Sequence, residues 1–584
     1  MAENIKSIFI LKKIFNIITN KKKLKIIRYN KKIQTKLNIK IDDYKKYETL
    51  KEFNKKFGLN INDINIKELD LRNRKIGNEG LKFLKKFQFE FKELEVLNLS
   101  YNKITDIQLL ENIQFKKLKE LNLSNNDISD INVLEKKHFE KLEKLDLSFN
   151  HYLSSVKILE KVNFNNLKIL DLSFNKITDI KILEKVNFNN LTFLNIYGTG
   201  ISDIKFLEKV NFKNLKILNI GSNKISDIEI LENVQFKELE ELYLSYNIIS
   251  NLSSLERVNF KKLKRLEITD AKISNLNFLG NLKFEELKIL ELHDNKISDI
   301  NILERVNFKK LEKICFCSNQ ISDIKVLEKV KFENLEKLVL SDNKISDIKV
   351  LEKVKFEKLK KLGIDNNKIT DIEILKNTNF KDLKELDLSC NKIKNNINVL
   401  GNVKFEKLEK LNLSYNRISN INVLKKVNFK ELKELNLSNN EIFDITVFKN
   451  VNFKELKDLR LDSNEIFDIT VLENVNFEKL ETLNLYHNKI KEIDVLGKVK
   501  FEKLETLDLS ENDISNINVL QKINFENLKE LDLSYNYYIS NVKILEKVNF
   551  QKVGKINLCG TKINEKSPII AKLNSKGEKI LIYN

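Results

Sequence analysis

The feature that most constrains this chain is a stretch of sequence that recurs about every 24 residues. The copy that begins at Phe332 reads FENLEKLVLSDNKISDIKVLEKVK, and the next reads FEKLKKLGIDNNKITDIEILKNTN. Numbered from its Phe, the repeat is F-x-x-L-x-x-L-x-L-x-x-N-x-I-x-x-I-x-x-L-x-x-V-x. It occurs 21 times; Asn holds position 12 in 17 copies, and Arg74, Thr199, Ala271 and Thr561 hold it in the other four. Because one repeat is too short to bury its own apolar side chains, neighbouring repeats must stack and share a core.

Two patterns within the repeat predict two kinds of element. Leu338 and Leu340, at positions 7 and 9, alternate with polar residues, which is typical of a short strand with one buried face. Ile345, Ile348 and Leu351 then follow at a spacing of three, which suits 3₁₀ turns or a short helix. We expect the strands of stacked repeats to form one parallel sheet.

The Asn at position 12 lies where the chain leaves the strand. Because its amide both donates and accepts hydrogen bonds, it can satisfy backbone groups left unpaired in that bend. We therefore predict a structural role for a ladder of these residues, which includes Asn102, Asn126, Asn175, Asn223, Asn295, Asn343, Asn367, Asn416, Asn464 and Asn512.

The pattern L-x-x-L-x-L-x-x-N at this period resembles the leucine-rich repeat family, over residues 61–563. The resemblance implies an α/β solenoid, a curved horseshoe with a parallel sheet on its concave face. The I-x-D-I motif at Ile297–Ile300 is also similar to phosphatase-regulatory and internalin-like binding proteins, although this repeat is two residues longer than theirs. A fold alone does not fix a function, so the site must be argued from its own residues.

Residues 1–60 lie outside the repeats and hold much of the positive charge. They contain 17 basic and 5 acidic residues, a net charge of +12 within a total of +20. We expect this segment to be helical. The other predicted boundaries are an atypical first repeat with a convex helix at 61–90, a regular array at 91–563, and a C-terminal cap at 564–584.

A second resemblance, to the F-box, lies within the N-terminal segment. It rests on the spacing Leu11-x-x-Ile14-Phe15-x-x-Ile18 followed by Leu24-x-x-Ile27-Arg28-Tyr29-Asn30. The usual Leu-Pro start and the later Cys and Trp are missing. The resemblance implies that residues 5–40 bind the adaptor of a cullin-type ubiquitin ligase, which would make this chain a substrate receptor. A helical cap over the first repeat is the alternative.

Cysteine usage favours a reducing compartment. Cys315 and Cys317 share one strand face, whereas Cys390 and Cys559 lie several repeats away, so neither a disulfide framework nor a zinc spacing is present. The apolar stretch at residues 5–18 is interrupted by lysines and is too short to span a membrane. We therefore expect a cytoplasmic protein, with a nuclear location as the alternative, and no transmembrane segment.

The predicted concave face combines negative charge with aromatic side chains. Positions 6, 8, 10 and 11 of the 21 repeats hold 21 acidic and 9 basic residues, a net charge of −12. Such a groove repels phosphate, so we expect no nucleic acid there and instead a protein partner with a basic surface. Tyrosine commonly anchors interfaces, although packing between neighbouring strands would also explain these rings. The predicted partner-binding residues are Tyr197, Tyr243, Tyr246, Glu267, Asp270, Glu291, Asp294, Tyr415, Tyr486 and Tyr535.

Two repeats that lose the position-12 Asn, at Thr199 and Ala271, are further candidate sites. By contrast, nothing in the sequence predicts catalysis. The four histidines lie in distant repeats, and no phosphate-binding loop or dinucleotide fingerprint is present. We expect no cofactor or metal, and the best-supported hypothesis is a non-catalytic, intracellular scaffold that binds a protein.

Overall fold

The computed structural model describes residues 35, 41–59, 61, 66–86, 91–113, 115–249, 251–523, 525–549, 555–564, 566–575 and 580–581. The chain forms two compact bodies. The N-terminal body comprises Met1–Ser254 with Val258–Phe260, and the C-terminal body comprises Leu255–Arg257 with Lys261–Asn584. Both bodies are built from the same repeat.

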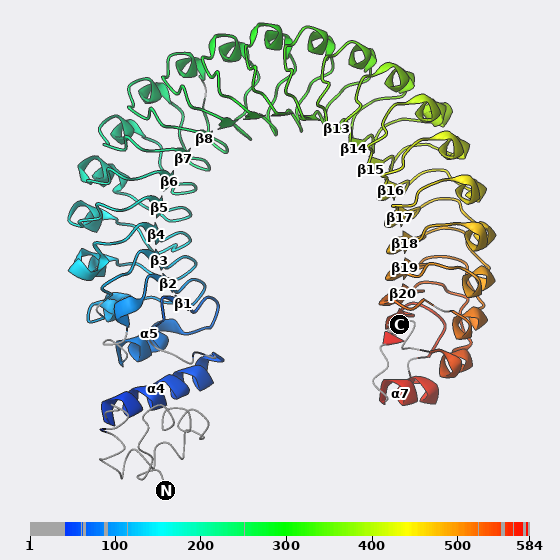
Figure 1. Cartoon of the computed structure of the whole chain (residues 1–584), viewed down its shortest axis with the longest axis horizontal. Coiled ribbons are helices and arrows are strands. Elements are labelled where there is room, and N and C mark those ends of the chain that lie inside the picture. Colours follow the sequence, from blue (N-terminus) through cyan, green and yellow to red (C-terminus); the bar gives the residue numbers. More distant parts are fainter. Residues whose placement is uncertain are drawn as a thin grey trace. The chain divides into compact units, whose positions relative to one another are not determined.

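Within each body, every repeat contributes one three-residue strand, and consecutive strands pair in parallel (Figure 1). The N-terminal body contains β1 (Glu68–Asp70), β2 (Val96–Asn98), β3 (Glu120–Asn122), β4 (Lys144–Asp146), β5 (Ile169–Asp171), β6 (Phe193–Asn195), β7 (Ile217–Asn219) and β8 (Glu241–Tyr243). The C-terminal body contains β9 (Arg265–Glu267), β10 (Ile289–Glu291), β11 (Lys313–Cys315), β12 (Lys337–Val339), β13 (Lys361–Gly363), β14 (Glu385–Asp387), β15 (Lys410–Asn412), β16 (Glu434–Asn436), β17 (Asp458–Arg460), β18 (Thr482–Asn484), β19 (Thr506–Asp508), β20 (Glu530–Asp532), β21 (Lys555–Asn557) and the two-residue β22 (Ile580–Leu581).

The opposite side of each repeat carries short helical turns. In the repeat that begins at Phe332 this element is η14 (Lys349–Glu352), a 3₁₀ helix. Its form follows from the sequence, because a 3₁₀ helix has three residues per turn and the apolar residues recur every three positions. The other 3₁₀ helices are η2 (Phe91–Glu93), η3 (Gln108–Leu110), η4 (Asn132–Glu135), η5 (Lys137–Phe139), η6 (Lys157–Glu160), η7 (Ile180–Lys185), η8 (Lys205–Glu208), η9 (Glu229–Glu232), η10 (Ser253–Glu256), η11 (Asn277–Asn281), η12 (Asn301–Arg305), η13 (Lys325–Glu328), η15 (Glu373–Asn377), η16 (Asn395–Asn402), η17 (Asn422–Lys426), η18 (Thr446–Asn450), η19 (Thr470–Asn474), η20 (Asp494–Gly497), η21 (Asn518–Gln521) and η22 (Val542–Lys547).

The core of each body lies between the strands and the 3₁₀ helices. In the Phe332 repeat, Phe332, Leu335, Leu338 and Leu340 are all buried. The same positions are buried in the neighbouring repeats, so the apolar side chains form continuous columns along each body. The predicted α/β solenoid with a parallel sheet is therefore confirmed, and its strands lie on the inner side of the curve of each body (Figure 1).

The position-12 Asn connects consecutive repeats. The Nδ2 of Asn343 donates to the carbonyl oxygen of Phe316 in the preceding repeat at 2.9 Å. It also donates to the carbonyl oxygens of Leu340 at 3.0 Å and Ser341 at 3.1 Å. Its Oδ1 accepts from the amide of Ile321 at 2.9 Å. One buried amide thus satisfies four backbone groups across two repeats, which explains why the sequence retains Asn here.

The repeat that contains Thr199 keeps part of this network without Asn. The Thr199 hydroxyl donates to the carbonyl oxygen of Ile196 at 2.9 Å, and the Thr199 amide donates to Oδ1 of Asn223 at 3.1 Å. The neighbouring Gly198 has φ +65°, a left-handed conformation that position 11 adopts throughout, for example at Tyr246 with φ 58°. The Gly198–Thr199 departure therefore has a structural explanation.

In the repeat that contains Ala271, the backbone amides near position 12 are hydrogen-bonded to the Asn of the next repeat. Oδ1 of Asn295 accepts from the amides of Ala271 at 3.0 Å and Ile273 at 3.1 Å. Ala271 itself is buried, so its side chain offers nothing to a partner.

Both ends of the described chain carry α-helices: α4 (Ile41–Phe57), α5 (Gly77–Lys86) and α7 (Pro568–Ser575). Phe53 and Phe57 of α4 pack against Phe83 of α5, with ring centroids 5.9 and 6.0 Å apart. A helix thus covers the first repeat. Apart from Thr35, residues 5–40 lie outside the described residues, so the F-box-like interpretation stays a prediction. No helix in the described part of the chain is long and apolar enough to cross a membrane.

Candidate functional site

Position 8 is the last residue of the strand in each repeat, and where it is Asp or Asn it has a structural role. Oδ1 of Asp387 accepts from the amide of Ser389 at 3.0 Å and from its hydroxyl at 2.6 Å. Asn412 makes the same two bonds to Ser414, at 3.2 and 2.8 Å. These are Asx turns, in which a short side chain holds the backbone two residues further on. The recurring [D/N]-x-S spacing is the sequence signal that could have revealed this role.

Two neighbouring position-8 carboxylates face each other on β4 and β5 of the N-terminal body. Asp146 and Asp171 are register partners, and both are half-buried. Burial raises the pKa of the Asp171 carboxyl, hydrogen bonds from Ser173 oppose that shift, and the charge of Asp146 adds to it. Asn195 also donates to Oδ2 of Asp171 at 2.9 Å. Negative charge is therefore crowded at this place on the inner face.

A row of four aromatic rings runs beside these carboxylates. The centroids of Phe149 and Phe174 lie 4.1 Å apart in a stacked arrangement, and those of Phe174 and Tyr197 lie 5.0 Å apart. Tyr246 continues the row 6.4 Å from Tyr197 and is 46% exposed. Gly221 leaves room for Tyr197, because a Cβ there would lie 2.9 Å from the ring. We call Phe149, Phe174, Tyr197 and Tyr246 the aromatic row. Tyr243 differs, because its hydroxyl donates to Glu241.

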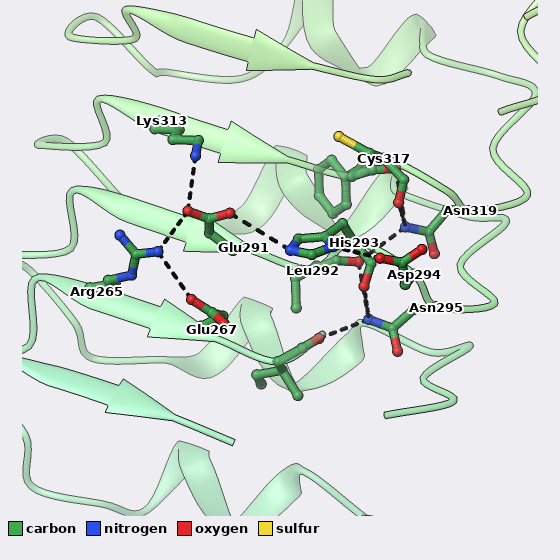
Figure 2. Close-up of polar contacts among 12 residues, drawn as sticks. Arg265, Glu267, Glu291, Leu292, His293, Asp294, Asn295, Lys313, Cys317 and Asn319 are labelled. Carbon is green, nitrogen blue, oxygen red and sulfur yellow. Dashed lines mark hydrogen bonds and ion pairs between the residues drawn. The ribbon is translucent and has the colours of Figure 1, made fainter. Parts of the chain in front are cut away.

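In the C-terminal body, the four acidic residues predicted to bind a partner, which we call the central patch, divide into two groups; they are Glu267, Asp270, Glu291 and Asp294. Figure 2 shows that Nη2 of Arg265 lies 3.0 Å from Glu267 and 2.9 Å from Glu291. Nζ of Lys313 lies 2.9 Å from the same Glu291 oxygen. Glu291 is buried, and basic neighbours compensate its charge. Summing charges along the sequence missed this pairing, which requires the register of β9, β10 and β11.

The other two acidic residues of that patch, Asp270 and Asp294, are exposed. Both occupy position 11 and have positive φ values, 45° and 56°. Nδ1 of His293 lies 2.7 Å from Oδ2 of Asp294 (Figure 2). The side chains of these two aspartates are more exposed than those of Glu267, which is half-buried, and Glu291, which is buried.

Further along the C-terminal body, strands β13 to β17 line a shallow hollow of about 330 Å³. Its charged side chains alternate in sign and pair across strands. Lys361 lies 2.8 Å from Glu385, and Lys410 lies 2.7 Å from Glu434. Arg460, at the end of the hollow, lies 2.8 Å from Asp458 in its own strand, β17. The surface here is polar and mixed in charge rather than simply acidic.

The remaining predicted tyrosines lie in two other places. Tyr415, which is 58% exposed, and Tyr486 line a second open hollow, together with His487. Tyr535 lies over Gly560, where a Cβ would approach its ring to 2.6 Å, and its centroid is 6.4 Å from that of Tyr537. The predicted residues thus form several separate clusters and not one site.

Models of the leucine-rich repeat family match several segments of the sequence. A model described as Leucine Rich repeats (2 copies) matches residues 92–136, 189–233, 333–377 and 478–522. A model described as Leucine Rich repeat matches residues 165–180 and 381–397. These segments coincide with the strand and 3₁₀ elements described above. This chain is a leucine-rich repeat protein.

Solved structures that resemble this leucine-rich repeat protein come from plants and bacteria. The ectodomain of the Arabidopsis thaliana receptor kinase GASSHO1/SCHENGEN3, solved with CASPARIAN STRIP INTEGRITY FACTOR 2, is 21% identical, with a TM-score of 0.49. The match covers 82% of this chain and 60% of the receptor chain, so this chain spans less than two thirds of the receptor's length. A Leptospira interrogans leucine-rich repeat protein is 21% identical over 80% of this chain and 97% of its own, with a TM-score of 0.47.

The internalin InlF of Listeria monocytogenes is 24% identical over 73% of this chain and 95% of its own, with a TM-score of 0.41. A comparison with curated proteins found no match.

The described residues of this leucine-rich repeat protein contain no group of three or more His, Cys, Asp or Glu side chains able to hold a metal ion. All four cysteines are free. Cys315 and Cys317 share a hydrogen bond, which lowers the pKa of Cys315 to about 7 and raises that of Cys317. Burial lowers the pKa of His138, which packs against Phe139 in the core of its repeat.

Proposed function

We propose that this leucine-rich repeat protein is a non-catalytic scaffold that holds a protein partner on its concave face. The observation that carries the proposal is a contrast between positions of the repeat. Positions 7 and 9 are buried and nearly constant, and position 10 is a buried Ser in about half of the repeats, whereas positions 6, 8 and 11 are mostly half-buried or exposed and differ from repeat to repeat. A rigid frame that displays varied side chains provides a broad surface for recognition.

The composition of that surface favours a protein over a small molecule as the binding partner. Aromatic rings and an exposed Arg460 lie among paired charges, and Tyr, Phe and Arg are enriched in protein interfaces. The hollow along β13 to β17 is shallow and polar, unlike the enclosed apolar pockets that hold small ligands.

A basic partner is the best fit where the acidic side chains form no ion pair within the described part of the protein. Among the described residues, no ion pair involves Asp146, Asp171, Asp508 or Asp532, and all four lie on the inner face. Charge complementarity at such places would mainly speed association and suppress wrong partners. Binding of a ubiquitin-ligase adaptor by residues 5–40 and a cytoplasmic location remain predictions that rest on the sequence.

Site-specific photo-cross-linking tests the proposal. A photoreactive amino acid would replace one exposed residue at a time in the full chain, at Glu120 and Lys337 on the strands or at Lys181 and Lys325 on the outer 3₁₀ helices. After irradiation in a cell extract, mass spectrometry would identify the cross-linked proteins. We expect the same protein to be captured from the strand positions and not from the outer positions. Capture only from the outer positions would overturn the proposal.

A further inference from the structure

We propose that the aromatic row and the adjacent pair Asp146 and Asp171 bind an extended polypeptide segment of the partner that carries Arg or Lys side chains. The inference rests on the proposed protein-binding function and adds a place and a chemistry to it. All of these residues belong to the N-terminal body.

The first argument is that carboxylates and rings come from the same repeats. Asp146 and Phe149 lie three residues apart at the end of β4, and Asp171 and Phe174 lie three residues apart at the end of β5. Asp146 pairs in register with Asp171, which in turn pairs with Asn195 of β6. Because neighbouring strands lie about 4.8 Å apart, the two carboxylates and two rings form a compact block.

The second argument is that this block has the composition of a cation site. A guanidinium or ammonium group gains from the face of an aromatic ring, and a carboxylate binds its N–H groups. The apolar stems of Arg and Lys also cover ring surface that is otherwise in contact with water. The rings are already fixed, because Phe149 stacks on Phe174 and Phe174 lies over Gly198, so a ligand would lose little by ordering them.

The third argument comes from the contrast with the acidic residues around Glu291. There, Arg265 and Lys313 already compensate Glu291, so a basic ligand would compete with internal ion pairs. In the described structure no ion pair includes Asp146 or Asp171. A cation brought by a partner would therefore relieve the crowding of negative charge at these two carboxylates.

The length of the row indicates the length of the ligand. The aromatic row extends from the repeat of β4 to the repeat of β8, which is four strand spacings or about 19 Å. An extended chain advances about 3.3 Å per residue, so about six residues would cover the row. Alternate side chains of such a segment point to the same side, so three of the six would face the aromatic row and its carboxylates.

Lys144, which has the same sign of charge as such a ligand, lies two residues before Asp146 on the same face of β4. It limits cation binding, so its removal should strengthen the site. Glu120, the register partner of Lys144 on β3, adds negative charge on the other side.

The test uses the full chain and a labelled peptide, acetyl-Arg-Gly-Arg-Gly-Arg-Gly-amide, with fluorescence anisotropy at low ionic strength. A matched peptide carries citrulline, a neutral isostere, in place of each Arg. Two double variants probe the block. Asp146→Asn with Asp171→Asn keeps the turn bonds that Asn122 already makes at position 8. Phe149→Asn with Phe174→Asn keeps the left-handed φ that Asn125 already adopts at position 11.

We expect the Arg peptide to bind, the citrulline peptide to bind at least tenfold more weakly, and each double variant to lose at least tenfold in affinity. Lys144→Ala should bind the Arg peptide more tightly. Asp387→Asn, the matched control in the C-terminal body, should bind as the wild type does. Circular dichroism would verify that each variant is folded.

Equal affinity of the two peptides, or equal affinity of the wild type and both double variants, would overturn this inference. That failure is distinguishable from failure of the proposed function. If strand-side cross-links persist while the peptide result is negative, the scaffold proposal stands and this site is wrong. If cross-links come only from the outer helices, the scaffold proposal fails whatever the peptide does.

Discussion

Asn343 and Phe316 lie in consecutive repeats, and the Nδ2 of Asn343 donates a 2.9 Å hydrogen bond to the carbonyl oxygen of Phe316. Equivalent bonds recur along both bodies, for example from Asn126 to Leu99 and from Asn512 to Leu485. The stacking of repeats is thus held by buried amides as well as by apolar columns. This framework fixes the backbone on which the outward-facing side chains vary.

The first prediction concerns this ladder. Asn343→Ala should lower the free energy of unfolding by about 2–4 kcal/mol, because several buried backbone groups lose their partner. Ser341→Ala, two residues earlier on the inner face, should cost less than about 1 kcal/mol. Urea denaturation followed by circular dichroism measures both. Equal costs for the two variants would mean that the Asn ladder does not hold the repeats together.

A second prediction concerns the buried glutamate of the inner face. Glu291→Ala should cost about 1–3 kcal/mol, because Arg265 and Lys313 would lose their shared partner in a half-buried place. Asp294→Asn, at an exposed position with positive φ that Asn tolerates, should change stability by less than about 0.5 kcal/mol. Thermal unfolding of the two variants would distinguish them. If the Asp294 variant loses more stability than the Glu291 variant, the assignment of buried and exposed charge is wrong.

A third prediction follows from the crowded carboxylates. Burial raises the pKa of Asp508, hydrogen bonds from Ser510 oppose the shift, and the charge of Asp532 adds to it. A carboxyl whose pKa is higher in the folded chain than in the unfolded chain contributes most stability below the unfolded pKa and loses it as the pH rises through the folded pKa. Asp508→Asn cannot ionise and can keep the turn, as Asn412 does with Ser414.

The Asp508→Asn variant should therefore be more stable than the wild type at pH 7, and the difference should shrink towards pH 4, near the ordinary pKa of aspartate. Urea midpoints of both proteins over this range measure the effect. A difference that grows as the pH falls would contradict the assigned direction of the pKa shift.

A fourth prediction concerns the start of the array. Removal of residues up to Gly58 would expose Phe83 and the apolar face of α5, which Phe53 and Phe57 cover. A chain that begins at Lys67 should melt earlier than one that begins at Ile41 and should bind more of a dye for exposed apolar surface. Identical melting of the two shortened chains would show that α4 is dispensable.

The repeat alone was enough to predict the fold, because its apolar spacing dictates which side chains are buried in every copy. Leu338 and Leu340 are buried as predicted, and the three-residue spacing after them gives the 3₁₀ helices. The boundary near residue 60, drawn from charge composition, separates α4 from the array, and only the alternative of a helical cap over the first repeat includes a contact such as that of Phe53 with Phe83 of α5. Contacts of this kind depend on tertiary packing, which composition does not record.

The inner face was harder to predict, because pairing across strands depends on register. A sum of charges counted Glu291 as available for a partner, although Arg265 and Lys313 compensate it. The repeat of Thr199 is a predicted candidate site because it lacks Asn, and there the Thr199 hydroxyl and amide keep part of the Asn hydrogen-bond network. Residues as different as Tyr246 and Asp294 adopt a left-handed φ at position 11, so residue type alone does not predict this conformation.

The measurement that tests the central claim most directly is the affinity of the cross-linked partner for two matched variants. Asp270→Asn with Asp294→Asn removes exposed charge from the inner face, and Lys325→Gln with Lys329→Gln removes it from the outer surface. Surface plasmon resonance at physiological salt should show slower association for the first variant and unchanged kinetics for the second. If the second variant loses the partner while the first retains it, the outer surface, and not the concave face, is the binding surface.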